Sequence, residues 1–194
     1  ETAETTAVEE YNGISWANSN TLITKQGCGA SGGSQAAAYI AGGESPAATT
    51  TTQEYTKNYI APYTTCVWSN GASLSTAKYQ LAGTGTQNAA LAMGGYTIPA
   101  AIVAGSEEYD GTSWSAGGTM ITARFHFAGA AGTQDAGLVF GGYVSPTDTN
   151  ATEEYNGSTW ASGGGLITAR RAGDTSIGTQ NAGVAAGGRS GAQC

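Results

Sequence analysis

The sequence predicts an all-β fold in which four similar units of short strands follow one another. Glycine pairs and tryptophans recur together along the chain, and a repeat with a period of about 20 to 50 residues is the signature of a repeat architecture. The glycine pairs are Gly42–Gly43, Gly94–Gly95, Gly141–Gly142 and Gly187–Gly188. The tryptophans are Trp16, Trp68, Trp114 and Trp160.

The spacing between recurring residues is constant. Each unit also carries an acidic segment that ends in a tyrosine (Tyr11, Tyr55, Tyr109 and Tyr155) and a Gly-Ser/Thr-Gln segment (Gln35, Gln87, Gln134 and Gln180). Each of these glutamines lies seven positions before the next glycine pair. Fixed spans are typical of paired strands and tight turns, and variable spans of surface loops. The chain is therefore predicted to be one domain, 1–194, of four units at about 7–52, 53–104, 105–150 and 151–194.

Each unit contains signals for four short strands. Residues 136–140 form an apolar run that ends at a glycine pair, as expected of a buried strand, with counterparts at 89–93, 36–40 and 184–186. Residues 125–128 are a second candidate strand. Residues 152–155 and 158–160 flank Asn156-Gly157, and Asn-Gly is a strong hairpin signal. Four-stranded units of this length predict the blades of a β-propeller.

The unit resembles the kelch repeat, in which an apolar run enters Gly-Gly and is followed by a Tyr, a Trp and a basic residue. Here Gly141-Gly142, Tyr155, Trp160 and Arg170 illustrate the pattern. The resemblance implies a four-bladed propeller of kelch-like repeats. The distance from Tyr to Trp is shorter than usual for kelch, and the inner strands are rich in Ala and Gly. This Gly/Ala-rich variant is also similar to repeat arrays in predicted structural proteins of marine bacteriophages.

The two ends of the chain predict how such a ring closes. The chain begins before the third strand of a blade (residues 7–11) and ends after a second strand (184–186). The terminal strands are therefore expected to share one blade, which removes unpaired sheet edges. Two chains that form one eight-bladed ring, a homo-oligomer, and an open array stacked into a filament are the alternatives.

Composition excludes several classes of function. Only seven basic residues are present and the formal net charge is −7, whereas nucleic-acid binding needs clustered Lys and Arg. No segment approaches the roughly 20 apolar residues of a membrane span. The three cysteines, Cys28, Cys66 and Cys194, lack metal-site spacing, so isolated thiols are expected, with a Cys28–Cys66 disulfide as the alternative.

No catalytic set is predicted, and we expect neither enzyme activity nor a cofactor. His126 is the single histidine, and it occupies the same repeat position as Cys28, which indicates a structural strand position. Neighbouring carboxylates such as Glu153 and Glu154 would point to opposite faces of a strand and would not share a substrate.

The candidate ligand-binding residues are aromatic and basic. Recurring tryptophans and basic residues are interpreted first as inter-blade packing and ion pairs, and alternatively as sugar-stacking and ligand-contacting groups. An eight-residue insertion at 57–64 departs from the repeat and brings two tyrosines. The candidates are Trp16, Trp68, Trp114, Trp160, Tyr59, Tyr63, Lys78, Arg124 and Arg170.

These features favour a non-catalytic structural or adhesive module. We expect it on an extracellular or virion surface, as part of a phage or cell-surface appendage with protein partners in a larger assembly. The alternative is a secreted, lectin-like propeller that binds a glycan at repeated sites between blades, where several shallow sites would give multivalent binding.

Overall fold

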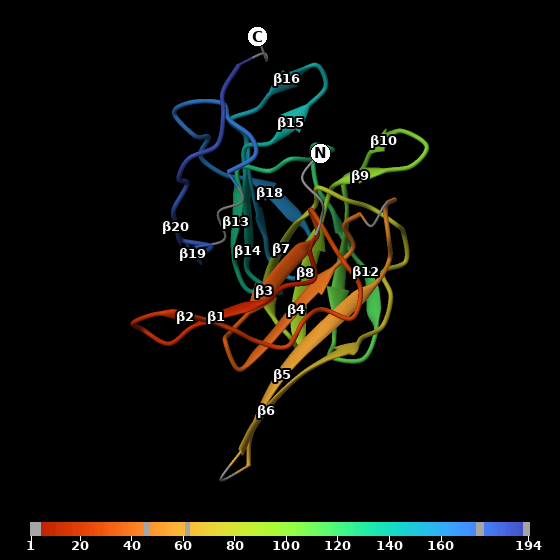
Figure 1. Cartoon of the computed structure of the whole chain (residues 1–194). Coiled ribbons are helices and arrows are strands. Elements are labelled where there is room, and N and C mark those ends of the chain that lie inside the picture. The colour runs from red at the N-terminus through yellow and green to blue at the C-terminus, as the bar shows by residue number, and fades with distance from the viewer. Residues whose placement is uncertain (1–4, 45–46, 61–62, 174–176, 192–194) are drawn as a thin grey trace.

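The chain folds into β-strands joined by short turns (Figure 1). The computed structural model describes residues 5–44, 47–60, 63–173 and 177–191, with the backbone alone for 58–60 and 63–65. These residues contain no helix, and so no helix long and apolar enough to cross a membrane. The all-β prediction is confirmed.

Three antiparallel sheets of four strands form most of the structure. The first sheet has the order β3 (Ala30–Gly33), β4 (Ala37–Ala41), β5 (Thr52–Ile60) and β6 (Tyr63–Asn70). The second has β7 (Ala82–Thr86), β8 (Ala89–Met93), β11 (Gly105–Tyr109) and β12 (Trp114–Thr119). The third has β13 (Gly129–Gly132), β14 (Gly137–Phe140), β17 (Thr152–Tyr155) and β18 (Trp160–Ser162). Each sheet therefore joins two strands of one sequence unit to two strands of the next.

Four two-stranded hairpins complete the fold. The N-terminal hairpin consists of β1 (Glu9–Tyr11) and β2 (Trp16–Asn18), and the C-terminal hairpin of β19 (Gly178–Thr179) and β20 (Ala182–Gly183). Two small hairpins, β9–β10 (Tyr96–Thr97 and Ala101–Ile102) and β15–β16 (Tyr143–Val144 and Thr147–Asp148), occupy the variable-length stretches after glycine pairs.

The predicted pairing of the terminal strands is not formed in this structure. Within the described ranges, β1 pairs only with β2 and β19 only with β20, so the two hairpins do not join into a fourth four-stranded sheet. One physical reason is that β20 ends at Gly183, whereas the sequence predicted a strand at 184–186. This leaves little strand for β1 to pair with.

A second predicted strand is displaced. The sequence predicted a strand at 125–128, but β13 begins at Gly129. Phe125 makes only an isolated bridge to Tyr143. The reason is local, because His126 has φ 49°, a left-handed conformation that no extended strand accommodates.

The hydrophobic core lies between neighbouring sheets. β7 contacts both β3 and β13, and Ala30, Ala82 and Ala130 on these inner strands are buried. A Cβ added at Gly83 would lie 2.7 Å from the Ala30 Cβ, so the inner backbones approach too closely for larger side chains. The close approach explains why the inner strands are rich in Ala and Gly.

In the first three units the glycine pair directly follows the second strand and ends it, because both glycines have positive φ. At Gly43, φ is 95° and an added Cβ would lie 2.3 Å from the Gly27 carbonyl oxygen. No L-residue with a side chain fits there without moving the backbone.

Candidate functional site

The recurring residues meet at the junctions between successive sheets. We call the contact between the N-terminal hairpin and the first sheet the first junction, and number the following junctions in chain order. At three junctions a tyrosine hydroxyl donates a hydrogen bond to a glutamate of the preceding element. The pairs are Tyr55 to Glu10, Tyr109 to Glu54 and Tyr155 to Glu108.

The glutamine of the Gly-Ser/Thr-Gln segment makes the second contact of each junction. Its side-chain amide donates to the backbone carbonyl of the tyrosine in the preceding element. The distances are 3.0 Å for Gln35 to Tyr11, 3.2 Å for Gln87 to Tyr55, 2.7 Å for Gln134 to Tyr109 and 2.6 Å for Gln180 to Tyr155. The fixed spacing of these residues therefore encodes one junction that is used four times.

The acidic pair divides between two roles, as the alternation of side chains along a strand predicts. Glu108 faces the next sheet, while Glu107 stays in its own sheet with its carboxylate 3.0 Å from the Lys78 ammonium group. Glu153 pairs in the same way with Arg124, which is 0% exposed and also donates to the Gly141 carbonyl. Lys78 and Arg124 lie in the connections that lead into the second and third sheets, and each is enclosed in an ion pair with a strand residue of the sheet that it enters.

The first sheet carries a neutral version of this pair. Gln26 stands where the other sheets have a cation, and its amide donates to the carbonyls of Gly42 and Thr51. Gln53 stands in place of the carboxylate and donates to Gln26. The missing cation and the missing carboxylate occur together, so no buried charge is left unpaired.

Arg170 is the third basic candidate. It is half-buried and donates to the Gly187 carbonyl at 3.4 Å, the bond that Arg124 makes to Gly141. The carboxylate at the corresponding repeat position is Glu9, which lies exposed on β1.

The tryptophans pack on the tyrosine that faces them across their own hairpin, with ring centroids 4.8 to 5.3 Å apart. Their indole N–H groups differ. Trp114 donates to the Thr52 hydroxyl at 3.0 Å, and Trp160 to the Gly118 carbonyl at 3.2 Å. Trp68 has a buried N–H without an acceptor, and Trp16 is 67% exposed.

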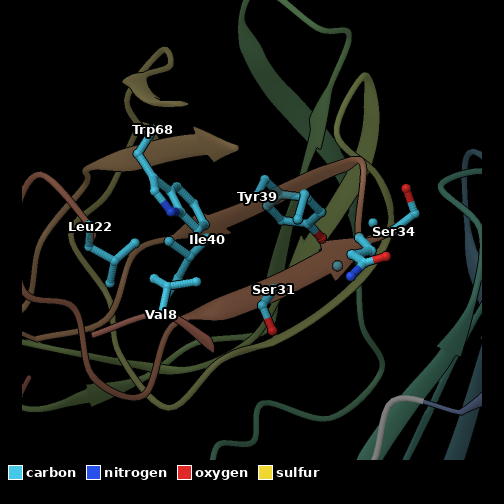
Figure 2. Close-up of a pocket in the computed structure, with 11 residues that line it drawn as sticks. Val8, Leu22, Ser31, Ser34, Tyr39, Ile40 and Trp68 are labelled. Carbon is cyan, nitrogen blue, oxygen red and sulfur yellow. The ribbon is translucent and has the colours of Figure 1, made fainter. Parts of the chain in front are cut away.

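A cavity of about 490 Å³ lies at the first junction, beside Trp68 (Figure 2). Val8, Leu22 and Ile40 gather near the indole, and Ser31 and Ser34 lie toward the other end. A second cavity of about 310 Å³ shares Val8, Gln35 and Trp68 and extends to Trp16. Of the predicted aromatic candidates, the structure brings Trp16 and Trp68 together at these cavities.

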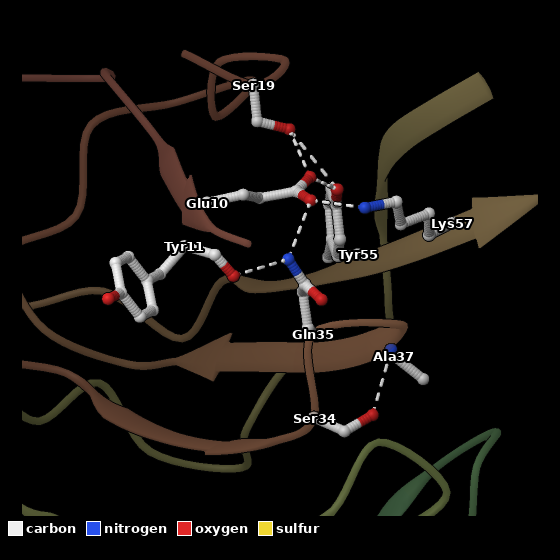
Figure 3. Close-up of polar contacts among 8 residues, drawn as sticks. All are labelled: Glu10, Tyr11, Ser19, Ser34, Gln35, Ala37, Tyr55 and Lys57. Atoms are coloured by element: carbon white, nitrogen blue, oxygen red, sulfur yellow. Dashed lines mark hydrogen bonds and ion pairs between the residues drawn. The ribbon is translucent and has the colours of Figure 1, made fainter. Parts of the chain in front are cut away.

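Glu10 holds the first junction together through a small polar network (Figure 3). Its carboxylate accepts hydrogen bonds from Lys57, Tyr55 and Ser19, the last at 2.7 Å. The Lys57 ammonium group, then Tyr55 and Ser19, lower the pKa of Glu10 to about 2. Lys57 begins the eight-residue insertion, so this clamp is specific to the first junction.

The insertion itself extends a hairpin. β5 and β6 continue their pairing to Ile60 and Tyr63 and project as an arm beyond the rest of the molecule (Figure 1). Tyr59 and Tyr63 lie at the far end of the paired strands, and their side chains are outside the described residues.

A third cavity, of about 340 Å³, is lined by residues from four successive units. Cys28, Gln80, His126 and Ala172 occupy equivalent positions in it, each with φ between 49° and 54°. Their backbones are linked in series, because Gln80 N–H donates to Cys28, His126 N–H to Gln80 and Ala172 N–H to His126. His126 and Cys28 do share a repeat position, but it is a left-handed link and not the strand position that was predicted.

The described part of the chain holds no group of three or more His, Cys, Asp or Glu side chains that could bind a metal. Cys28 and Cys66 are not bonded to each other, so the alternative of a disulfide between them is wrong for this structure. Cys194 lies outside the described residues.

The pocket at the first junction was missed by sequence reasoning, although the sequence carries its signal. Val8 stands at the position that Thr52 and Ser106 occupy in later units, three residues before the tyrosine. Comparison with known proteins adds no name to the site. No protein-family model matches the chain, and no curated protein matches it significantly.

Proposed function

We propose that this chain is a non-catalytic structural or adhesive module of an extracellular or virion surface, built as a four-bladed propeller of kelch-like repeats. One observation carries the proposal: recurring tyrosines and glutamines make the same contacts between successive sheets along the chain. Tyr109 reaches Glu54 as Tyr155 reaches Glu108, and the junction glutamines repeat four times. Residues that recur in order to make such contacts have a structural role.

The closure of the ring is part of this proposal. In the second sheet, Glu107 lies opposite Ala92 across β11 and β8, and in the third sheet Glu153 lies opposite Val139. The same register in a fourth blade would set Glu9 opposite Ala185. Glu9 would then reach Arg170, which donates to the Gly187 carbonyl. The pair would repeat the ion pair of Arg124 with Glu153 in the third sheet.

A fourth Tyr–Glu contact, which ring closure would form, supports the same arrangement. Tyr11 is 47% exposed, whereas its equivalents Tyr55, Tyr109 and Tyr155 are buried and donate to a glutamate of the preceding element. The repeat-equivalent acceptor for Tyr11 is Glu154. Closure would therefore bury one more tyrosine and form one more ion pair.

Light scattering combined with electron microscopy tests the proposal. We expect particles of one chain, or of a defined small oligomer, with the outline of a short propeller. The charge reversal Glu9→Arg should open the closing blade and Arg170→Glu should restore it in the double variant. Particles without a propeller outline, or glycoside hydrolysis that is lost on a Glu→Gln change in one unit alone, would overturn the proposal.

A second candidate function is glycan binding, favoured by the cavity beside Trp68. The later junctions use their tryptophan N–H groups internally, whereas the cavities at the first junction are lined by the rings of Trp68 and Trp16, so this candidate has one site and not four repeated ones. A glycan array tests this candidate, and silence across the array would leave the structural role alone.

A further inference from the structure

Four isolated β-bridges occupy equivalent places in the four units. The first residue of each bridge follows the recurring position of Lys78 and Arg124, and the second directly follows a glycine pair. The bridged pairs are Gly27–Glu44, Tyr79–Tyr96, Phe125–Tyr143 and Arg171–Arg189. The backbone contact recurs while the side chains change from unit to unit, so the repeat does not dictate their chemistry.

The rings of the two middle pairs form one continuous row, which we call the aromatic row: Tyr79, Tyr96, Phe125 and Tyr143. Neighbouring ring centroids are 5.1 to 5.6 Å apart, and the contact between Tyr96 and Phe125 joins the two units. All four side chains are half-buried, so each keeps part of its surface exposed to solvent. Tyr96 begins β9 and Tyr143 begins β15, and the β9–β10 and β15–β16 hairpins lie at the same end of the molecule (Figure 1).

The two ends of the aromatic row carry opposite charges. At one end, burial raises the pKa of Tyr79, and the nearby carboxylate of Glu44 adds to this effect. At the other end, the Arg171 guanidinium group lies 4.2 Å from the centroid of the Tyr143 ring. Arg171 pairs with Asp148 at 3.2 Å, whereas its bridge partner Arg189 is exposed. The row therefore runs from an acidic end at Glu44 to a basic end at Arg189.

This pattern is complementary to itself. Turned end to end, the row presents aromatic rings to aromatic rings and an acidic group to a basic group. Tyrosine, phenylalanine and arginine are enriched at protein interfaces, and a two-fold dimer, in which the same surface of both subunits meets, is the commonest symmetric assembly. The surface that best fits the row is therefore a second copy of the same row, because opposite charges then meet at both ends.

We infer that this end of the molecule is the interface of a homodimer in which the aromatic rows of two copies lie antiparallel. A two-fold axis that crosses the row between Tyr96 and Phe125 sets the tyrosine pair of one copy on the Phe125–Tyr143 pair of the other. The same axis sets Glu44 of each copy against Arg189 of the other. Each copy keeps its own strands, so this dimer differs from an eight-bladed ring shared by two chains and goes beyond the proposed function.

Sedimentation equilibrium of the full chain tests the dimer through charge reversals at the two ends of the row. We expect the unchanged protein to form a dimer that dissociates on dilution. Glu44→Arg and Arg189→Glu should each raise the dissociation constant about tenfold or more, because both charge contacts of the symmetric interface become repulsive. The double variant exchanges the two charges and should dimerise like the unchanged protein.

A mixture of the two single variants and one matched control locate the effect. The equimolar mixture should dimerise like the unchanged protein, because each variant supplies the charge that the other needs, whereas mixing could not restore a Glu44–Arg189 pair within one chain. The control is Asp135→Arg, which changes the net charge as Glu44→Arg does. Asp135 is exposed and precedes β14, whereas Tyr143 follows it, so the control lies at the opposite end of the third sheet and should leave the dissociation constant unchanged. Circular dichroism reports whether each variant keeps the fold.

The outcomes separate this inference from the proposed function. A protein that stays monomeric at every concentration would overturn the inference, while a propeller outline of that monomer in electron microscopy would keep the proposed function. A dimer that is unaffected by both charge reversals would reject this interface. Folded single variants that do not dimerise when mixed would reject the antiparallel arrangement.

Discussion

The neutral Gln26–Gln53 pair allows a direct test of how the repeat handles buried charge. In the first sheet these two amides occupy the places of Lys78 and Glu107 in the second sheet. All four side chains are at least nine-tenths buried. We expect Gln53→Glu alone and Gln26→Lys alone to destabilise the protein strongly, and the double variant to recover most of the loss.

The magnitude follows from the contacts. Gln53 accepts from the backbone N–H groups of Ile23 and Thr24, at 2.8 and 3.2 Å, and donates to the Thr24 carbonyl at 2.8 Å. A carboxylate keeps the accepted bonds but faces the Thr24 carbonyl without a proton. Leaving one buried charge uncompensated costs about 3–5 kcal/mol, which is a large part of a typical stability of about 5–15 kcal/mol. The double variant should show a coupling energy of at least about 2 kcal/mol.

Urea unfolding of the four proteins at neutral pH measures this cycle through the midpoint and slope of each transition. The matched control is the reverse exchange, Lys78→Gln with Glu107→Gln, which installs the neutral pair in the second sheet and should be close to neutral as a double variant. If the losses of Gln26→Lys and Gln53→Glu simply add in the double variant, the two positions are not a pair in the folded protein and the reasoning fails.

Three further changes test single contacts. Because the pKa of Glu10 is lowered from 4.5 to about 2, its ionised form stabilises the fold above pH 4.5, and this contribution of about 1 kcal/mol should be lost as pH falls toward 2. Thr52→Val should leave the Trp114 N–H without an acceptor and lower the unfolding free energy by about 1–3 kcal/mol. Gly43→Ala should cost about 2 kcal/mol or more, since its φ is 95° and the new Cβ would meet the Gly27 carbonyl oxygen.

Each of these has its own control. Unfolding free energies of Glu10→Gln and the unchanged protein should converge at low pH, and a constant gap across pH would reject the ionic explanation. Thr52→Ser keeps a hydroxyl and should lose less than Thr52→Val. Gly105→Ala places a Cβ where nothing lies within 4 Å and should be tolerated, so equal losses at Gly43 and Gly105 would contradict the steric argument.

The sequence was informative where a residue type is tied to a fixed distance. The strand at Ala89–Met93 and the strand at Thr152–Tyr155 lie where the apolar run and the acidic-Tyr segment predicted them. The hairpin at Asn156-Gly157 also forms, with Tyr155 opposite Trp160. These elements are local, so their signals are complete within a few residues.

Contacts between units were harder to predict, because they depend on which sheet lies beside which. The tryptophans were expected between blades, but nothing in the spacing showed that Tyr109 would contact Glu54 or that Gln134 would contact the Tyr109 carbonyl. The left-handed link at His126 was missed because its counterparts Cys28, Gln80 and Ala172 are of residue types that rarely adopt positive φ, so the repeat as a whole carries no signal for it.

The departures from the repeat are concentrated at the first junction. Val8 replaces a hydroxyl, Lys57 adds a cation that clamps Glu10, and the β5–β6 arm extends beyond its sheet. The constant spacing of the repeat keeps the residues that pack between sheets in register. A residue that departs from the pattern does not take part in that packing. The clamp fastens the N-terminal hairpin to the first sheet by a contact that the insertion supplies. The first junction therefore keeps the glutamine and tyrosine contacts of the repeat, although its hydroxyl is lost and a cavity lies beside it.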